Sequence, residues 1–251
     1  MAITLVQYNK GAATSATSLT VTLTSSTTAG NCLIVAVGTS DDAGGTESPN
    51  VTAINLGGAA GNFASTGAGT SSNANSPNTF IWADPNCAGG QTSVAITMSG
   101  DSSTFKPVAG AYVFEFSGLA TSSVTDASPS GTSHGSSGTT WASPSTGTLA
   151  QANELVVGMC LLELSATGTV TGPSSPWTNL QANISGGPYS QATIIVGYQV
   201  VSATTALTYS GTTSSTQIYA SAIASFKGAA TSPDFTSPLM VNQAVKRSAV
   251  W

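Results

Sequence analysis

Short apolar runs rich in β-branched residues, each bounded by Gly, Ser, Asn or Pro, recur along almost the whole chain. Runs of this length and composition are typical of β-strands, whereas a helix would show an apolar residue every three or four positions. No segment combines such a helical stripe with caps. The sequence therefore predicts an all-β protein, with strands near residues 3–8, 19–23, 32–37, 51–56, 79–82, 93–98, 111–116, 155–162, 177–180, 192–201, 206–209 and 218–226.

The strand pattern occurs twice, which predicts two similar half-repeats. A buried strand opens each set, and a strand ending in Phe-x-Gly closes it. The matched segments are 33–37 with 155–159, 55–56 with 179–180, 80–82 with 194–196, 98–100 with 209–211, and 116–118 with 226–228.

Two architectures fit this duplication. The halves, about residues 1–120 and 149–230, could form one jelly-roll-like double-sheet β-sandwich in which both contribute strands to both sheets around one core. Alternatively, each half could be a small sandwich of its own. We favour the combined sandwich over residues 1–230, with the Ser/Gly-rich stretch 121–148 as a connection in which Trp141 indicates partial docking.

Low charge excludes several functional classes. Only 6% of the residues are charged while 40% are hydrophobic, and five Lys and Arg stand against ten Asp and Glu. Disorder requires low hydrophobicity and high net charge, helical bundles require charged surface helix formers, and nucleic-acid binding requires a basic surface. Hydroxyl groups must therefore supply most of the polar surface.

Residues 1–8, the lengths of the apolar runs and the cysteines indicate where the protein is made. Residues 1–8 show neither the basic region nor the long apolar stretch of a secretory signal, and no apolar run is long enough for a membrane helix. We therefore expect synthesis in a cytoplasm and no membrane partner. Cys32, Cys87 and Cys160 have no metal or redox spacing. Cys32 and Cys160 lie inside apolar strand-like runs and are expected to be buried free thiols.

Residues 231–251 differ from the rest and are expected to form a C-terminal arm. Two prolines end the sandwich pattern, and the segment is too apolar for a solvated tail. An arm that packs on a neighbouring subunit explains this composition. Its expected partner-binding residues are Phe235, Leu239, Met240, Val245, Lys246, Arg247 and Trp251.

No catalytic site is predicted. His134 lies in a polar stretch without a positioned nucleophile, and Glu115 and Glu163 are expected to point outward into solvent, since their flanking apolar residues point inward. The acidic loop with Asp41, Asp42 and Glu47 does not have the spacing of a defined calcium loop. We therefore predict no enzyme activity, no metal and no cofactor.

Carbohydrate binding is the main alternative to a purely structural role. Sugar sites use exposed aromatic faces, and Trp141, Trp177 and Tyr189, with Tyr198, are candidates. The competing interpretation is that these rings pack in the core or between sheets, as we expect for Trp82.

Four segments resemble bacterial and tailed-phage jelly-roll-like β-sandwich virion proteins. They are residues 28–37, 88–97, 114–119 and 222–227. The resemblance implies a sandwich located on the outside of a particle and assigns no functional residues. It does not include the arm.

Together these observations predict a structural protein on the exterior of a tailed-phage particle, most simply a capsid decoration (cement) protein. It would act by subunit packing, with itself as a homo-oligomer and with the major capsid protein or tail proteins as partners, and without nucleic acid. The alternative is a tail or fibre adhesin that binds host-surface glycans.

Overall fold

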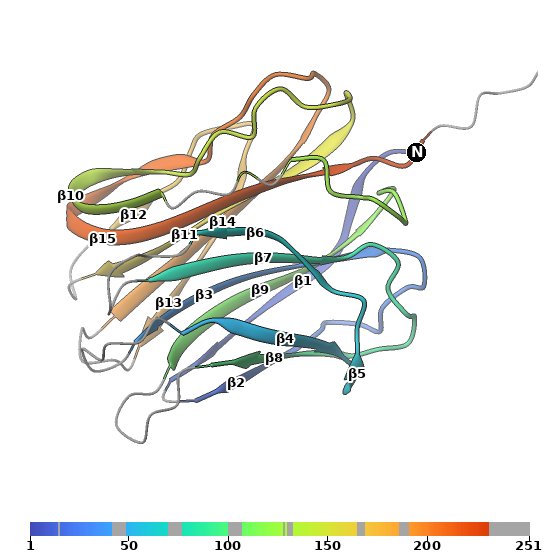
Figure 1. Cartoon of the computed structure of the whole chain (residues 1–251), viewed down its shortest axis with the longest axis horizontal. Helices are drawn as coiled ribbons and strands as arrows, with labels where there is room; N and C mark the ends of the chain where they lie inside the picture. Colours follow the sequence, from blue (N-terminus) through green and yellow to red (C-terminus); the bar gives the residue numbers. More distant parts are fainter. Residues whose placement is uncertain are drawn as a thin grey trace, which may run out of the picture.

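The chain folds into antiparallel β-sheets stacked in three layers (Figure 1). The computed structural model describes residues 1–14, 16–41, 49–69, 77–99, 107–127, 129, 133–164, 169–185 and 191–230. No helix occurs among these residues, so none of them forms a helix that could cross a membrane. The prediction of an all-β sandwich is confirmed.

The middle layer is a five-stranded sheet built from the first half of the chain. Its strands in spatial order are β1 (Thr4–Ala13), β9 (Pro107–Ser117), β3 (Cys32–Asp41), β7 (Asn78–Asp84) and β6 (Ala64–Gly69). On one side it is covered by a second sheet of the same half, made of β2 (Ser18–Thr22), β8 (Ser93–Met98), β4 (Val51–Leu56) and β5 (Ala59–Ala60).

The third layer is a six-stranded sheet built from the second half. Its main path is β10 (Ser133–Ala142), β15 (Ser210–Lys227), β11 (Glu154–Leu164), β14 (Gln191–Val201) and β13 (Thr178–Ser185), and β12 (Val170–Thr171) also pairs with β15. Each sheet therefore comes from one half, and the expectation that both halves contribute strands to both sheets is wrong. The predicted strand at 206–209 lies in an irregular segment instead.

The two large sheets repeat the same strand order. β1, β9, β3, β7 and β6 correspond in turn to β10, β15, β11, β14 and β13. The closing Phe residues anchor this correspondence, because Cys32 pairs with Phe116 and Leu155 pairs with Phe226. Cys32, rather than Leu33, is therefore the counterpart of Leu155, so the match of 33–37 with 155–159 is wrong by one residue.

Two of the other sequence matches join strands that do not correspond. Residues 55–56 lie in β4 of the covering sheet, whereas 179–180 lie in β13 of the six-stranded sheet. Residues 98–100 begin at the end of β8, and 209–211 lead into β15. Asn and Ser-Gly are common where strands begin or end next to a turn. Asn-Leu and x-Ser-Gly therefore recur beside unrelated strands.

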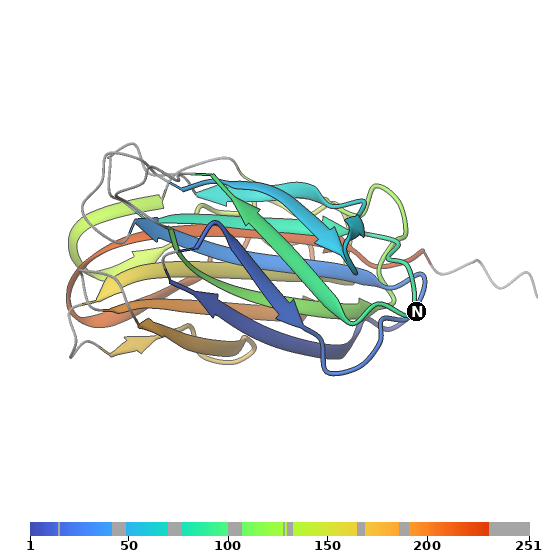
Figure 2. The same cartoon turned by 90° about the horizontal axis from the view of Figure 1, so that it is seen from below.

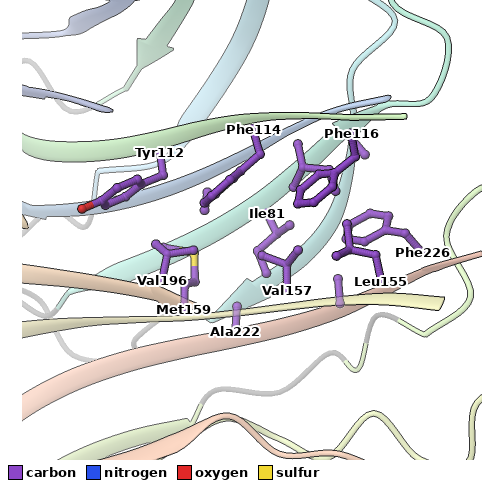
Figure 3. Close-up of a cluster of buried hydrophobic side chains, with 14 of the residues drawn as sticks. Ile81, Tyr112, Phe114, Phe116, Leu155, Val157, Met159, Val196, Ala222 and Phe226 are labelled. Carbon is purple, nitrogen blue, oxygen red and sulfur yellow. The ribbon is translucent and has the colours of Figure 1, made fainter. Parts of the chain in front are cut away.

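The main core lies between the two large sheets. Tyr112, Phe114 and Phe116 of β9 point from the middle layer toward Leu155 and Met159 of β11 (Figure 3). The opposite face of the middle layer packs its own buried aliphatic residues against the covering sheet. Because both faces of the middle layer are buried, β3 is a continuous apolar run over 32–37 rather than an alternating one.

The beginning of the connecting stretch is held against the end of β15. Lys227 donates a backbone hydrogen bond to Val124 (2.7 Å), and Asp126 donates one to Ser225 (3.0 Å). Thr125 forms a β-bridge with Phe226. Residues 118–127 therefore lie beside β15 as an added segment, and the later part of the stretch contains β10.

Candidate functional site

An aromatic cluster covers the outer face of the six-stranded sheet. The ring of Tyr209 lies 5.2 Å from that of Trp141 and 4.9 Å from that of Trp177, measured between centroids. Trp141 and Tyr209 are buried and Trp177 is half-buried. We call these three residues the aromatic cover.

Glycines in the strands below make room for the aromatic cover. A Cβ added to Gly158 would lie 2.3 Å from Cβ of Tyr209, and one added to Gly211 would lie 2.5 Å from Cζ2 of Trp141. Glycine inside a strand often marks such a close approach. Gly158 and Gly211 are therefore the residues from which the aromatic cover could have been predicted.

Hydrogen bonds fix Tyr209 in this position. Its hydroxyl donates to Oδ1 of Asn179 (2.9 Å), whose Nδ2 donates to the carbonyl of Pro173 (2.6 Å). Its backbone N–H donates to Oγ of Ser143 (2.9 Å). Burial raises the pKa of Tyr209 far above its ordinary value, so the phenol stays a donor.

The structure separates the residues predicted to bind glycans. Trp141 is only 1% exposed, so it belongs to the core and offers no sugar-binding face. Trp177 keeps part of its surface exposed, and Tyr198 packs on the edge of the main core against Phe114 and Phe116. Tyr189 lies outside the described residues. Trp82, expected in the core, is half-buried and packs against it.

Glu115 is fully buried, so its predicted outward, solvated position is wrong. Its side chain accepts hydrogen bonds from Nε2 of Gln7 (2.6 Å), Nδ2 of Asn31 (2.6 Å) and the backbone N–H of Thr28 (2.9 Å). Alternation does place Glu115 on the face opposite its aromatic neighbours, but the side chain of Gln7 on the adjacent strand and the turn before β3 enclose it there. The carboxylate is therefore a buried structural acceptor.

Glu163 is also wrongly predicted as solvated. It accepts a hydrogen bond from the hydroxyl of Ser40 on β3 and is partly buried between the two large sheets. Glu115 lies opposite Leu33, at the other end of β3 from Ser40. At about 3.3 Å per residue, the seven positions between Leu33 and Ser40 separate the two carboxyl groups by about 23 Å. That distance is too long for the carboxylate pair of a glycosidase.

A second buried carboxylate, Glu154, was missed by the sequence analysis. Its Oε1 accepts a hydrogen bond from the backbone N–H of Gln151 (3.2 Å), while the neighbouring N–H of Ala150 donates to Oδ2 of Asp126 (2.8 Å). The other oxygen, Oε2, is buried without a well-aligned hydrogen bond, beside the hydroxyl of Ser225 and the carboxyl of Asp126. Burial, opposed by the Ser225 hydroxyl and reinforced by Asp126, raises the pKa of Glu154 above 4.5.

The remaining candidates add no reactive group. Cys32 and Cys160 are buried free thiols, as expected; Cys87 is a buried free thiol too, and burial raises its pKa to about 12. Residues 42–48 of the acidic loop and the whole C-terminal arm, with all seven of its expected binding residues, lie outside the described residues. His134 lies in β10 and pairs through its backbone with Ala220 of β15. Within the described part of the chain, no three His, Cys, Asp or Glu side chains form a group that could hold a metal.

The exposed apolar surface lies along one flank of the sandwich. The large apolar side chains exposed among the described residues are Val6 and Tyr8 on β1 (46% and 40%), Val200 on β14 (46%) and the terminal Met1. Tyr8 stacks 6.0 Å from Phe114, which lies 5.9 Å from Tyr198 on β14. This apolar flank, defined by Val6, Tyr8 and Val200, is bordered by β1 and β13, which run along one margin of the molecule (Figure 2).

Comparisons of the chain with protein-family models, with curated proteins and with solved structures find no match.

Proposed function

We propose that this chain is a structural protein on the exterior of a tailed-phage particle, a capsid decoration protein that acts by subunit packing. The apolar flank is the observation that carries the proposal. Val6, Tyr8 and Val200 are exposed there, while the other large apolar side chains described, apart from the terminal Met1, are buried or half-buried. An exposed apolar patch of this kind on a β-sandwich is typical of a protein-binding surface.

The composition favours association by packing rather than by charge. With 6% charged residues, the chain has few ion pairs to offer to a partner. The apolar arm at 231–251 would add contacts of the same kind. Attraction between surface charges weakens as salt screens it, whereas burial of apolar area does not.

The copy number of the protein in purified particles tests this function. Hundreds of copies per particle are expected for a decoration protein, and they should remain bound in about 1 M NaCl, where the Debye length is about 3 Å. A variant lacking residues 231–251 should no longer be incorporated. A handful of copies would place the protein in a tail, and absence from particles would overturn the proposal.

Glycan binding by a tail or fibre adhesin is the second candidate, and Trp177 is the observation that favours it. Its ring is half-buried, and the exposed amide of Gln181 follows it on the outer face of β13. A glycan array with the wild type, Trp177→Ala and the control Trp82→Ala separates the two candidates. Binding that only Trp177→Ala abolishes supports the adhesin, and an array without signal supports the decoration protein.

A further inference from the structure

The two large sheets are offset by one strand at the apolar flank. β13 lies over β9, since a Cβ added to Gly110 of β9 would meet Cδ1 of Ile184 at 2.5 Å. β1 is the next strand beyond β9, and it extends past the edge of the six-stranded sheet. Its core-facing side is consequently open: Tyr8, Lys10 and Ala12 lie opposite the core-facing Phe114, Tyr112 and Gly110, yet all three are exposed.

The strand next to this open face has a free edge. β13 ends the sheet path, and none of the described residues pairs with its outer side. Its sequence, TNLQANIS, contains no charge and no proline. Exposed edge strands are usually protected against pairing by lysine, proline or a bulge. A strand added to β13 would continue the six-stranded sheet directly over β1.

We propose that the edge of β13 accepts a strand from the C-terminal arm of a second copy of this chain, which completes the sandwich over β1. The inference rests on the proposed packing role of the arm and names its acceptor. Backbone hydrogen bonds to β13 would supply affinity, and side chains on one face of the added strand would cover Tyr8.

The sequence of the arm suits this position. After Pro238 the chain has no further proline. In a strand, Leu239, Val241, Gln243 and Val245 share one face, and Met240, Asn242, Ala244 and Lys246 share the other. The first face, with three large aliphatic side chains, suits the open side of β1, and the second, with Asn242 and Lys246, would point to solvent. Residues 231–238, with two prolines, would act as the spacer.

Strand polarity favours a second copy over the chain's own arm. The described chain leaves β15 at the end of the sheet where β13 begins, because Lys227 pairs with Glu154, Glu154 with Val201, and Thr178 with nearby Tyr198. If the chain's own arm entered from this end, it would run parallel to β13, whereas every strand pair among the described residues is antiparallel.

The spacer is too short for an antiparallel approach within one chain. The arm would first have to cross four strand spacings, about 19 Å, and travel the ten residues from Val201 to Gln191, about 33 Å, which together make about 38 Å. The backbone N–H groups of Gly228 and Ala229 are bound to the carbonyls of Asn153 and Gly118, so these residues cannot serve as spacer. The eight residues 231–238 that remain reach at most about 29 Å. An arm from a second copy has no such limit.

The self-association of the purified full chain tests the inference. We expect a concentration-dependent oligomer in sedimentation, with slow hydrogen exchange over 178–185, and a monomer with fast exchange there when residues 231–251 are removed. Ala182→Lys places an ammonium on the core-facing side of β13, where an added strand would bury it, and should raise the dissociation constant at least about tenfold. The control Gln181→Lys adds the same charge on the outer, exposed side and should change the constant little.

A second pair of variants does not depend on the stability of β13. Val241→Asp on the apolar face of the arm should weaken association at least about tenfold, since it would bury an unpaired carboxylate, and Asn242→Asp on the other face should not. A wild type that is monomeric with unprotected 178–185 overturns the inference. So does protection of 178–185 in a monomer, which means docking of the chain's own arm, or an oligomer that survives removal of the arm.

Particle incorporation keeps the two proposals distinguishable. A chain that self-associates as described but is absent from particles contradicts the decoration role and leaves the strand exchange intact. If the wild type and Ala182→Lys are both monomeric and the variant is still incorporated into particles, decoration is supported and the strand exchange is overturned.

Discussion

The two halves of the molecule build the same five-strand order but cover its outer face in different ways. In the first half, four short strands place aliphatic side chains such as Val21, Val94 and Ile96 on the middle layer. In the second half, Trp141 of the edge strand β10 and Tyr209 of an irregular segment cover the sheet. A repeated scaffold therefore leaves the outer covering free to diverge, provided that the apolar face is buried.

The halves also solve one hydrogen-bonding problem in two ways. The turn before β3 presents the N–H of Thr28, and the turn before β11 presents that of Gln151, at corresponding positions. The acceptor is Glu115 on β9 in the first half and Glu154 at the start of β11 in the second. Either strand can supply the carboxylate, but Glu115 accepts three hydrogen bonds, whereas Glu154 accepts one that is well aligned.

Removing the largest ring of the aromatic cover should have the largest effect. Trp141→Ala should lower the free energy of unfolding by about 3–5 kcal/mol, measured by urea denaturation, because it leaves a cavity over Gly211. Trp141→Phe should cost clearly less, since the buried Nε1 of Trp141 has no hydrogen-bond partner to lose. Hydrogen exchange should quicken over the second half alone; equal quickening in β2 and β8 would contradict independent covers.

The buried carboxylate of the first half should be nearly as sensitive. In Glu115→Gln, one of the carboxylate oxygens becomes an NH2 group among three donors, from Gln7, Asn31 and Thr28. We expect a loss of about 2–4 kcal/mol in the free energy of unfolding, because a buried donor is left facing another donor. Glu154→Gln is the matched control, and equal losses in the two variants would mean that the networks do not differ.

Periodicity was enough to predict the strands that carry the core. Runs such as 32–37 and 111–116 can be recognised as strands from their own residues, because burial on one or both faces requires apolar side chains there. β10 and β6 could not be found in this way, because SHGSSGTTWA and ASTGAG hold their places through backbone pairing with neighbours far along the chain.

The burial of polar residues could not be predicted from alternation. Alternation correctly separates Glu115 from Phe114 and Phe116, but it cannot say whether the opposite face meets water or another layer. The three-layer stack makes that second face an interior. Trp141 indicated that its segment docks, but its polar surroundings in sequence gave no sign of which surface lies beneath it.

The close fit between strand glycines and the aromatic cover predicts a moderate effect. Gly158→Ala should lower the free energy of unfolding by about 1–3 kcal/mol, because the new methyl group would overlap Tyr209. Gly138→Ala on β10 is the control, since its added Cβ would meet its nearest neighbour at 3.6 Å, an ordinary contact. Thermal denaturation measures both variants, and a loss for Gly138→Ala as large as that for Gly158→Ala would rule out the steric cause.

The smallest effect, and the one with a distinctive pH dependence, is expected at Glu154. Its pKa in the folded protein is raised above the 4.5 of an exposed group, so protonation favours folding. Its contribution to stability is full below pH 4.5 and is lost as the pH rises through the raised pKa. Glu154→Gln, neutral at every pH, should remove this slope and leave the free energy of unfolding at pH 7 within about 1 kcal/mol of the wild type, or higher. A stability that instead rises with pH in the wild type relative to Glu154→Gln would show that the neighbours of Glu154 stabilise its charged form.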